Sequence, residues 1–232
     1  MKPDGANPQK LAALLRRVKS QHKVEDPLLS DPVAQLVIGF LQWQASRRRA
    51  QRAFAELLEK MVDINELRVS HPREIITVIG ESYPFASDRV IRLRETLNEI
   101  YRREHAMALT SIGGRSKKEQ RQYLETLPGI MPYVTSQVML LAFGGHAFPV
   151  DEKLVTMLVG ERVLAEPVSV AHVESFILRH VKASDSLQTH MAMQAWSDSR
   201  RSPTAPRSRK GSSVKRTSSR KKSNTKRTKK KK

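Results

Sequence analysis

Apolar residues recur at helical spacing along most of the chain. Leu11, Leu14, Leu15 and Val18 illustrate the pattern, because intervals of three and four residues place them on one face of a helix. No segment alternates apolar and polar residues with a period of two over more than a few positions. The pattern therefore predicts an all-α fold of roughly ten short helices joined by brief loops and packed as two lobes.

Residues that start and stop helices set the expected boundaries. Asp31 before a proline and Asp151 before an apolar segment are typical N-caps, and we expect Asp88 to cap a longer helix. Gly113-Gly114 and Gly144-Gly145 are expected to form helix-ending turns. The expected helices cover about residues 8–23, 32–41, 54–61, 64–67, 75–79, 88–100, 117–126, 131–141, 153–163, 170–180 and 187–196.

The charge of the chain is concentrated at its C-terminus. The 232 residues include 42 Lys and Arg against 23 Asp and Glu, a formal net charge of +19. Residues 200–232 hold 16 of the basic residues and no acid, which leaves 26 basic against 23 acidic residues elsewhere. From residue 197 onward Ser, Thr, Pro, Lys and Arg predominate, too polar a mixture to form a core. We therefore predict a helical domain over residues 1–198 and a disordered tail over 199–232.

The basic tail indicates a polyanionic partner. Lysine-rich blocks, which include Lys221, Lys222, Lys229 and Lys230, bind nucleic acids by releasing condensed counterions, with little sequence preference. Double-stranded DNA is the expected partner. RNA stays open as a ligand of the tail, because a polycation does not distinguish between the two polyanions.

Several classes of site and location are disfavoured by composition. The chain has no cysteine, which excludes disulfides, thiolate metal sites and iron–sulfur clusters, and the seven histidines show no metal-binding spacing. We expect no metal and no cofactor. The longest apolar run, residues 138–143, is too short to span a bilayer, and the N-terminus lacks the apolar stretch of a signal peptide. We expect a soluble monomer without membrane contact, cytoplasmic and nucleoid-associated, or nuclear in a eukaryote.

A glycine-containing hairpin is the most informative local motif. Leu127, Pro128, Gly129, Ile130 and Met131 separate two expected helices. A tight hairpin of this kind can point backbone N–H groups and a helix N-terminus at a phosphate, without reading the base sequence. We treat these five residues as candidate DNA-binding residues, although such turns serve a purely structural role about as often.

The residues downstream of this hairpin resemble the endonuclease III branch of the helix-hairpin-helix DNA glycosylases. The specific block runs from residue 127 to 151, and the weaker resemblance covers about residues 10–197. The matching segments are Leu127-Pro128-Gly129-Ile130, Leu141-Ala142-Phe143-Gly144, Pro149-Val150-Asp151, Gln44-Ala45-Ser46, His71-Pro72 and Val173-Glu174 with Ile177-Leu178. The resemblance implies a two-lobed helix-hairpin-helix fold, a DNA partner and base-excision repair of damaged or mismatched bases.

The resemblance also assigns roles to individual residues. The family aspartate that matches Asp151 stabilises the positive charge that develops on the deoxyribose or helps to activate the attacking water. Tyr133 stands where bifunctional members carry a nucleophilic lysine, and a phenol forms no imine, so the resemblance implies a monofunctional N-glycosylase without Schiff-base lyase activity. Gln44 matches the residue that enters the gap left by a flipped base, and an ordinary polar residue at a helix end is the alternative. Arg47 is a candidate phosphate contact.

Two alternatives stay open. Asp151 suits a simple helix cap, a role compatible with catalysis. The family usually has glycine two residues after the hairpin glycine, whereas this chain has Met131, followed by Pro132 without an N–H for a phosphate. This departure and the missing lysine favour a non-catalytic, nucleoid-associated DNA-binding protein that kept the fold and lost the chemistry.

Overall fold

The computed structural model describes residues 5–22 and 31–200, and these residues form helices and loops without a strand. The expected all-α class is confirmed. The helices are α1 (Pro8–Gln21), α2 (Pro32–Gln42), α3 (Arg47–Lys60), α4 (Ile64–Val69), α5 (Pro72–Ile79), α6 (Ala86–Glu104), α7 (Thr110–Gly113), α8 (Lys117–Glu125), α9 (Pro132–Leu141), α10 (Glu152–Gly160), α11 (Val170–His180) and α12 (Ala183–Ser199). Residues 201–232, most of the predicted tail, lie outside the described residues.

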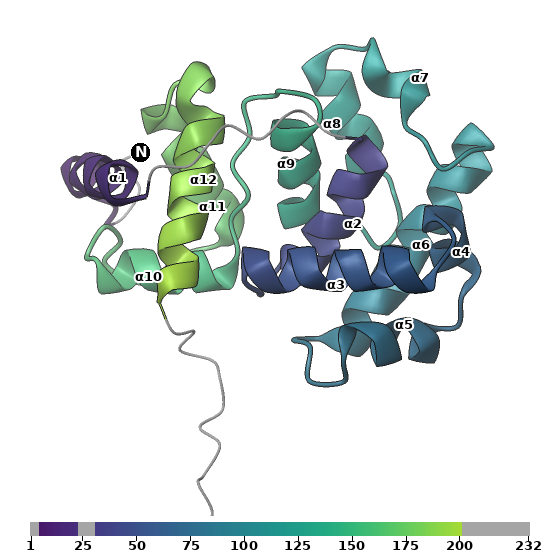
Figure 1. Cartoon of the computed structure of the whole chain (residues 1–232). Coiled ribbons are helices and arrows are strands. Elements are labelled where there is room, and N and C mark those ends of the chain that lie inside the picture. The colour runs from purple at the N-terminus through teal and green to yellow at the C-terminus, as the bar shows by residue number, and fades with distance from the viewer. Residues whose placement is uncertain (1–4, 23–30, 201–232) are drawn as a thin grey trace, which may run out of the picture.

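The first lobe comprises α2 to α9 and is built around α2 (Figure 1). Leu36, Val37 and Phe40 of α2 are completely buried, because this helix is covered by α3, α6 and α9. Gly39 permits the close approach of α9, since a Cβ atom there would lie 3.3 Å from Cγ1 of Val134. The packing fixes α9, and therefore the hairpin before it, against the centre of the lobe.

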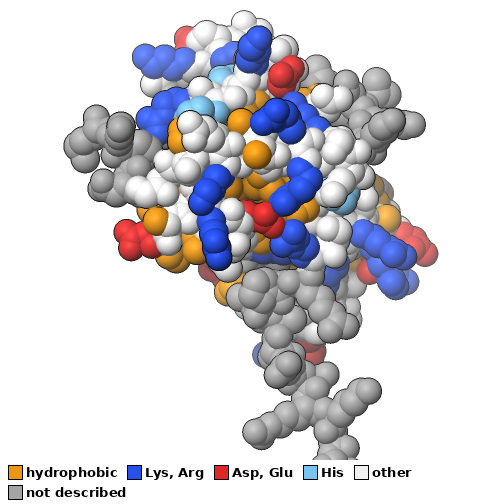
Figure 2. All heavy atoms as spheres, turned by 90° about the vertical axis from the view of Figure 1, so that its left-hand side faces the viewer, with side chains coloured by type: hydrophobic (Ala, Val, Ile, Leu, Met, Phe, Trp, Pro, Cys, Tyr) orange, Lys and Arg blue, Asp and Glu red, His pale blue; other side chains and the backbone are white. Residues whose placement is uncertain are grey.

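The second lobe comprises α1, α10, α11 and α12, with its own apolar core. Leu11 on α1 and Trp196 on α12 are both buried in this core, so the two ends of the described domain lie side by side (Figure 1). Glu161 at the end of α10 accepts Arg17 at 2.5 Å and Arg200 at 2.8 Å. Figure 2 shows the outer face of this lobe, where Lys and Arg side chains gather around a small acidic and apolar centre.

The expected helices are present, but several boundaries differ: α3 begins at Arg47 rather than at residue 54, and α5 at Pro72 rather than at residue 75. Asp31 and Asp151 cap α2 and α10 as expected. Asp88 does not cap α6, which begins two residues earlier after Phe85 in a left-handed conformation; Asp88 lies in the first turn and pairs with Arg92. Gly113 belongs to the one-turn helix α7 rather than to a turn. Helix α12 is longer than expected at both ends, because its polar flanking residues interrupt the apolar pattern.

No helix of the described residues is long and apolar enough to cross a bilayer.

Candidate functional site

The hairpin of residues 126–131 joins α8 to α9 and rests directly on α6. Gly129 has a φ of +75°, and a Cβ atom there would lie 2.5 Å from the carbonyl oxygen of Arg92, so only glycine fits. The Thr96 hydroxyl donates to the Pro128 carbonyl at 2.7 Å. Leu127 and Met131 turn their side chains into the core.

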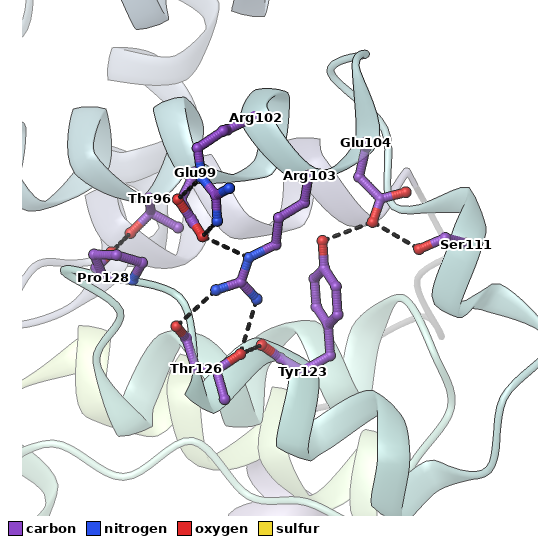
Figure 3. A network of polar contacts seen from close by, with 9 residues as sticks. All are labelled: Thr96, Glu99, Arg102, Arg103, Glu104, Ser111, Tyr123, Thr126 and Pro128. Atoms are coloured by element: carbon purple, nitrogen blue, oxygen red, sulfur yellow. Dashed lines mark hydrogen bonds and ion pairs between the residues drawn. The ribbon is translucent and has the colours of Figure 1, made fainter.

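A second set of contacts holds the start of the hairpin (Figure 3). Arg103 on α6 donates to the hydroxyl and the carbonyl oxygen of Thr126 at 2.8 and 3.0 Å. Glu99 accepts Arg103 at 2.6 Å and also accepts Arg102, and these hydrogen bonds lower the pKa of Glu99 to about 2. The carboxylate therefore stays charged and keeps Arg103 oriented. Within the described residues, the N–H groups of Gly129 and Met131 donate no hydrogen bond, so both are free for a ligand.

Asp151 lies where the two lobes meet. Its Oδ1 accepts the N–H of Leu154 at 2.8 Å, which makes it the N-cap of α10. Its Oδ2 accepts the N–H of Gln44 at 3.3 Å, from the turn between α2 and α3 in the other lobe. Burial raises the pKa of Asp151, and the two N–H donors oppose this effect. The structure thus brings Asp151 and Gln44 together.

Tyr133, on the first turn of α9, is 4% exposed and lines the same junction. Its hydroxyl accepts Nε2 of Gln42 at 3.1 Å. Burial raises the pKa of Tyr133, and the charge of nearby Asp151 adds to the shift, so the phenol is neutral. Lys153 donates to the Ser197 carbonyl at 3.0 Å, within electrostatic reach of the Asp151 and Asp198 carboxylates.

A pocket of about 220 Å³ opens between the two lobes, and Val150 and Glu152, the chain neighbours of Asp151, line it. Its apolar walls include Trp43 and Val170, and Tyr133 forms its inner side. Glu152 lines the pocket and accepts the side-chain amide of Gln44. The complete lining is Trp43, Asp88, Arg92, Met131, Pro132, Tyr133, Val150, Glu152 and Val170.

Arg47 is half-buried and is held by contacts within the domain. Its backbone N–H donates to Asp198 at 2.9 Å, and its guanidinium contacts the sulfur of Met191 at 3.3 Å. Burial lowers the pKa of Arg47. The structure therefore does not group Arg47 with the hairpin. The tail residues Lys221, Lys222, Lys229 and Lys230 lie outside the described residues.

Arg89, which the sequence analysis did not single out, organises the Trp43–Gln44 turn. It is fully buried and donates to the carbonyl oxygens of Phe40, Trp43 and Pro84, the last two at 2.7 and 2.9 Å. Burial lowers the pKa of Arg89 to about 10, so it stays charged at neutral pH. Arg89 lies four residues before Leu93, so both side chains are on the apolar face of α6. This spacing is the sequence signal for a buried arginine.

The chemistry of the site follows from these groups. A fixed carboxylate, a neutral phenol and an aromatic-walled pocket adjoin a hairpin with free N–H donors. Among the described residues, no three His, Asp or Glu side chains come together in a way that would hold a metal ion.

Several solved structures share the fold of this chain. No protein-family model matches the chain, and no curated protein matches it by sequence. A trapped endonuclease III–DNA covalent intermediate superposes with a TM-score of 0.61 at 18% identity, covering 82% of this chain and 85% of that one. The 8-oxoguanine glycosylase/lyase of Clostridium acetobutylicum, in complex with double-stranded DNA, gives 0.63 at 16% identity over 81% and 68%. A thermostable thymine-DNA glycosylase gives 0.60 at 17% identity over 87% and 89%.

These similarities confirm the resemblance at the level of fold. The described domain has the all-α helix-hairpin-helix architecture of the endonuclease III-like DNA glycosylases.

Proposed function

From this shared fold, we propose that the protein is a monofunctional DNA N-glycosylase that acts in base-excision repair on damaged or mismatched bases. The observation that carries the proposal is the Asp151 carboxyl group, fixed between the two lobes, with its chain neighbours Val150 and Glu152 lining a 220 Å³ pocket that has room for a nucleobase. The solved structures of this fold include enzyme–DNA complexes, which supports double-stranded DNA as the partner.

Each part of the site has a role in the proposed reaction. The free N–H groups of Gly129 and Met131 and the N-terminus of α9 bind a backbone phosphate. A base that leaves the helix enters the pocket beside Trp43, and Gln44 fills the gap it leaves. Asp151 stabilises the positive charge that builds on the deoxyribose as the glycosidic bond breaks.

The absence of an amine at position 133 supports hydrolysis over Schiff-base chemistry. The neutral Tyr133 phenol is held by Gln42 and forms no imine with the sugar. The Lys153 ammonium group donates to the Ser197 carbonyl. Water is therefore the proposed nucleophile.

The rest of the chain has an electrostatic role in this proposal. The tail, with Lys221, Lys222, Lys229 and Lys230, supplies non-specific affinity for DNA, and RNA is its alternative ligand. Such a protein acts as a monomer close to the nucleoid, or in the nucleus of a eukaryote. It needs no metal or other cofactor for hydrolysis by this route.

A second candidate function is a DNA-binding protein without catalysis. Both oxygens of Asp151 already accept backbone N–H donors, and Glu152 holds the Gln44 side chain, contacts that suit a purely structural junction.

A lesion screen separates the two functions. The full-length protein is incubated with duplexes that carry uracil, thymine mismatches, oxidised pyrimidines or alkylated purines, followed by alkali to cut abasic sites. The enzyme predicts cleavage of at least one duplex, lost in Asp151→Asn. Binding without cleavage of any duplex favours the non-catalytic protein.

A further inference from the structure

A buried imidazole without a hydrogen-bond partner lies beside the candidate site. His190 on α12 is 3% exposed, and its ring nitrogens bond to no described residue. The ring packs edge-on against Phe148, with 5.5 Å between centroids and an interplanar angle of 89°. Burial, together with the charge of Arg47, lowers the pKa of His190 to about 3, so the ring is neutral and offers one donor and one acceptor. Buried groups of this kind are normally satisfied by water or by a ligand.

Two small polar cavities meet at His190. The inner cavity, about 10 Å³, is lined by His190, Asp151 and Tyr133, among others. This volume corresponds to roughly one water molecule, and the lining provides the polar partners that a buried water requires. Asp151 uses one acceptor site on each oxygen for its backbone donors, and a carboxylate has about four in all, so it can also accept a water hydrogen.

The outer cavity, about 60 Å³, is also lined by His190. Arg47 and four glutamines, Gln35, Gln42, Gln51 and Gln137, line it. Gln137 is 1% exposed and its Oε1 has no hydrogen-bond partner. Because Gln51 is exposed to solvent, this polar cavity is a suitable reservoir for several waters.

Tyr133 lines both the inner cavity and the 220 Å³ pocket, so the two spaces adjoin at this residue. A lysine at this position would attack the sugar directly. With a phenol there, the nucleophile has to be water, and the inner cavity, which Asp151 also lines, has room for one.

We propose that His190 is a positioning residue that, with Asp151 and Tyr133, holds one water in the inner cavity, and that this water is the nucleophile. This inference rests on the glycosylase function proposed above. The water oxygen forms a bond to C1′ of the deoxyribose as the glycosidic bond breaks, and the base leaves with the electron pair. One water hydrogen stays on the new sugar hydroxyl. The other passes to the Asp151 carboxylate and from there to the departing base.

The first test is structural and independent of activity. A crystal structure of the full-length protein at high resolution should show one ordered water within hydrogen-bond distance of both His190 and Asp151. His190→Leu should lose this water, and His190→Gln, which keeps a donor and an acceptor, should retain it. A dry inner cavity in the unmodified protein overturns the inference, whether or not the protein is a glycosylase.

The second test is kinetic and uses the substrate found in the lesion screen. His190→Leu should slow single-turnover base release by about 100-fold, the usual effect of misplacing a reacting group, with unchanged DNA affinity. His190→Gln should recover most of that rate. In water–methanol mixtures, His190→Leu should also form a larger share of methyl glycoside, because the attack then comes from bulk solvent.

The outcomes are distinguishable. An unchanged rate and an unchanged methanol share in His190→Leu refute the role of His190 while leaving the glycosylase function intact. If the screen finds no substrate, the proposed function fails, and the nucleophile assignment fails with it even if the water is present.

Discussion

At the scale of single residues, Asp151 combines two demands that conflict. As a cap it stabilises α10, but its burial makes the ionised form costly, as the raised pKa indicates. A poorly solvated carboxyl group with a raised pKa is typical of an active site. Asp151 is therefore expected to lower the stability of the fold while it supports the proposed base release, and both effects can be measured.

Asp151→Asn tests both effects. Asparagine keeps the cap but not the charge, so base release should fall by about 10²- to 10³-fold, the usual loss for one electrostatic contact to a transition state. Because the folded-state pKa is raised, ionisation of Asp151 destabilises the fold above that pKa. The variant should therefore melt at an equal or higher temperature at neutral pH, and the difference should disappear as the pH falls through the pKa.

Asp31→Asn is the matched control, because Asp31 caps α2 at an exposed site with an N–H contact of 2.7 Å. Its Tm and activity should change little. An Asp151→Asn variant that cleaves DNA as fast as the unmodified protein removes Asp151 from the mechanism.

Tyr133 stands where bifunctional glycosylases carry a lysine, and a second prediction at the residue scale follows from this difference. Borohydride reduction in the presence of abasic-site DNA should trap no covalent adduct in the cleft, because the Tyr133 phenol forms no imine. Tail lysines are a source of weak background, so the form truncated after Arg200 is the protein to use, with peptide mapping of any adduct. A strong adduct mapped to Lys153 contradicts the monofunctional assignment.

The family resemblance singled out Asp151 and Tyr133 by their positions downstream of the hairpin, and Gln44 by its place after an apolar helix. They did not identify Arg89, His190 or Asp198 as functional neighbours. Periodicity marks Arg89 as interior without showing that it binds the carbonyls of a distant turn. The amphipathic pattern of α12 is weak, so the burial of His190 depends on tertiary packing that the local sequence does not encode.

At the scale of elements, the hairpin is positioned by α6 rather than by its own sequence. Gly129 touches the α6 backbone, and Thr96 and Arg103 reach across to the hairpin carbonyl groups. The sequence predicted the turn from its Leu-Pro-Gly motif, but not this support. The incorrect cap at Asp88 has a related cause: Arg89 binds the carbonyl of Pro84 and fixes the chain so that α6 starts earlier than its capping residues suggest.

Gly129→Ala tests the support of the hairpin. The left-handed φ costs about 1–2 kcal/mol, and the clash with the Arg92 carbonyl adds a cost of about 1–3 kcal/mol. Chemical denaturation should show a loss of this combined size, with weaker DNA binding under conditions where the variant is folded. Gly160→Ala, in α10 with no atom near the added Cβ, is the control and should be neutral or slightly stabilising. Equal stability of the two variants contradicts the close packing of hairpin on α6.

At the scale of the whole molecule, charge and fold are separated along the chain. The core residues of both lobes precede residue 197, whereas 15 of the 42 basic residues follow Arg200. Arg200 itself belongs to the domain, because it pairs with Glu161 and stacks on Trp196, with 4.9 Å from Cζ to the ring centroid. A truncation after Arg200 therefore removes charge without disturbing a described contact.

This truncation should leave the Tm unchanged and weaken binding to random duplex DNA. Each phosphate contact contributes about 0.9 to the slope of log affinity against log salt, so the loss of about five tail contacts should flatten the slope by about 4.5. Fluorescence anisotropy across a salt series measures the affinity and its salt slope. Base release at saturating protein should be preserved, because Asp151, Tyr133 and His190 all lie in the domain. A slope that is the same with and without the tail assigns the affinity to the hairpin surface, and the tail then has no part in holding DNA.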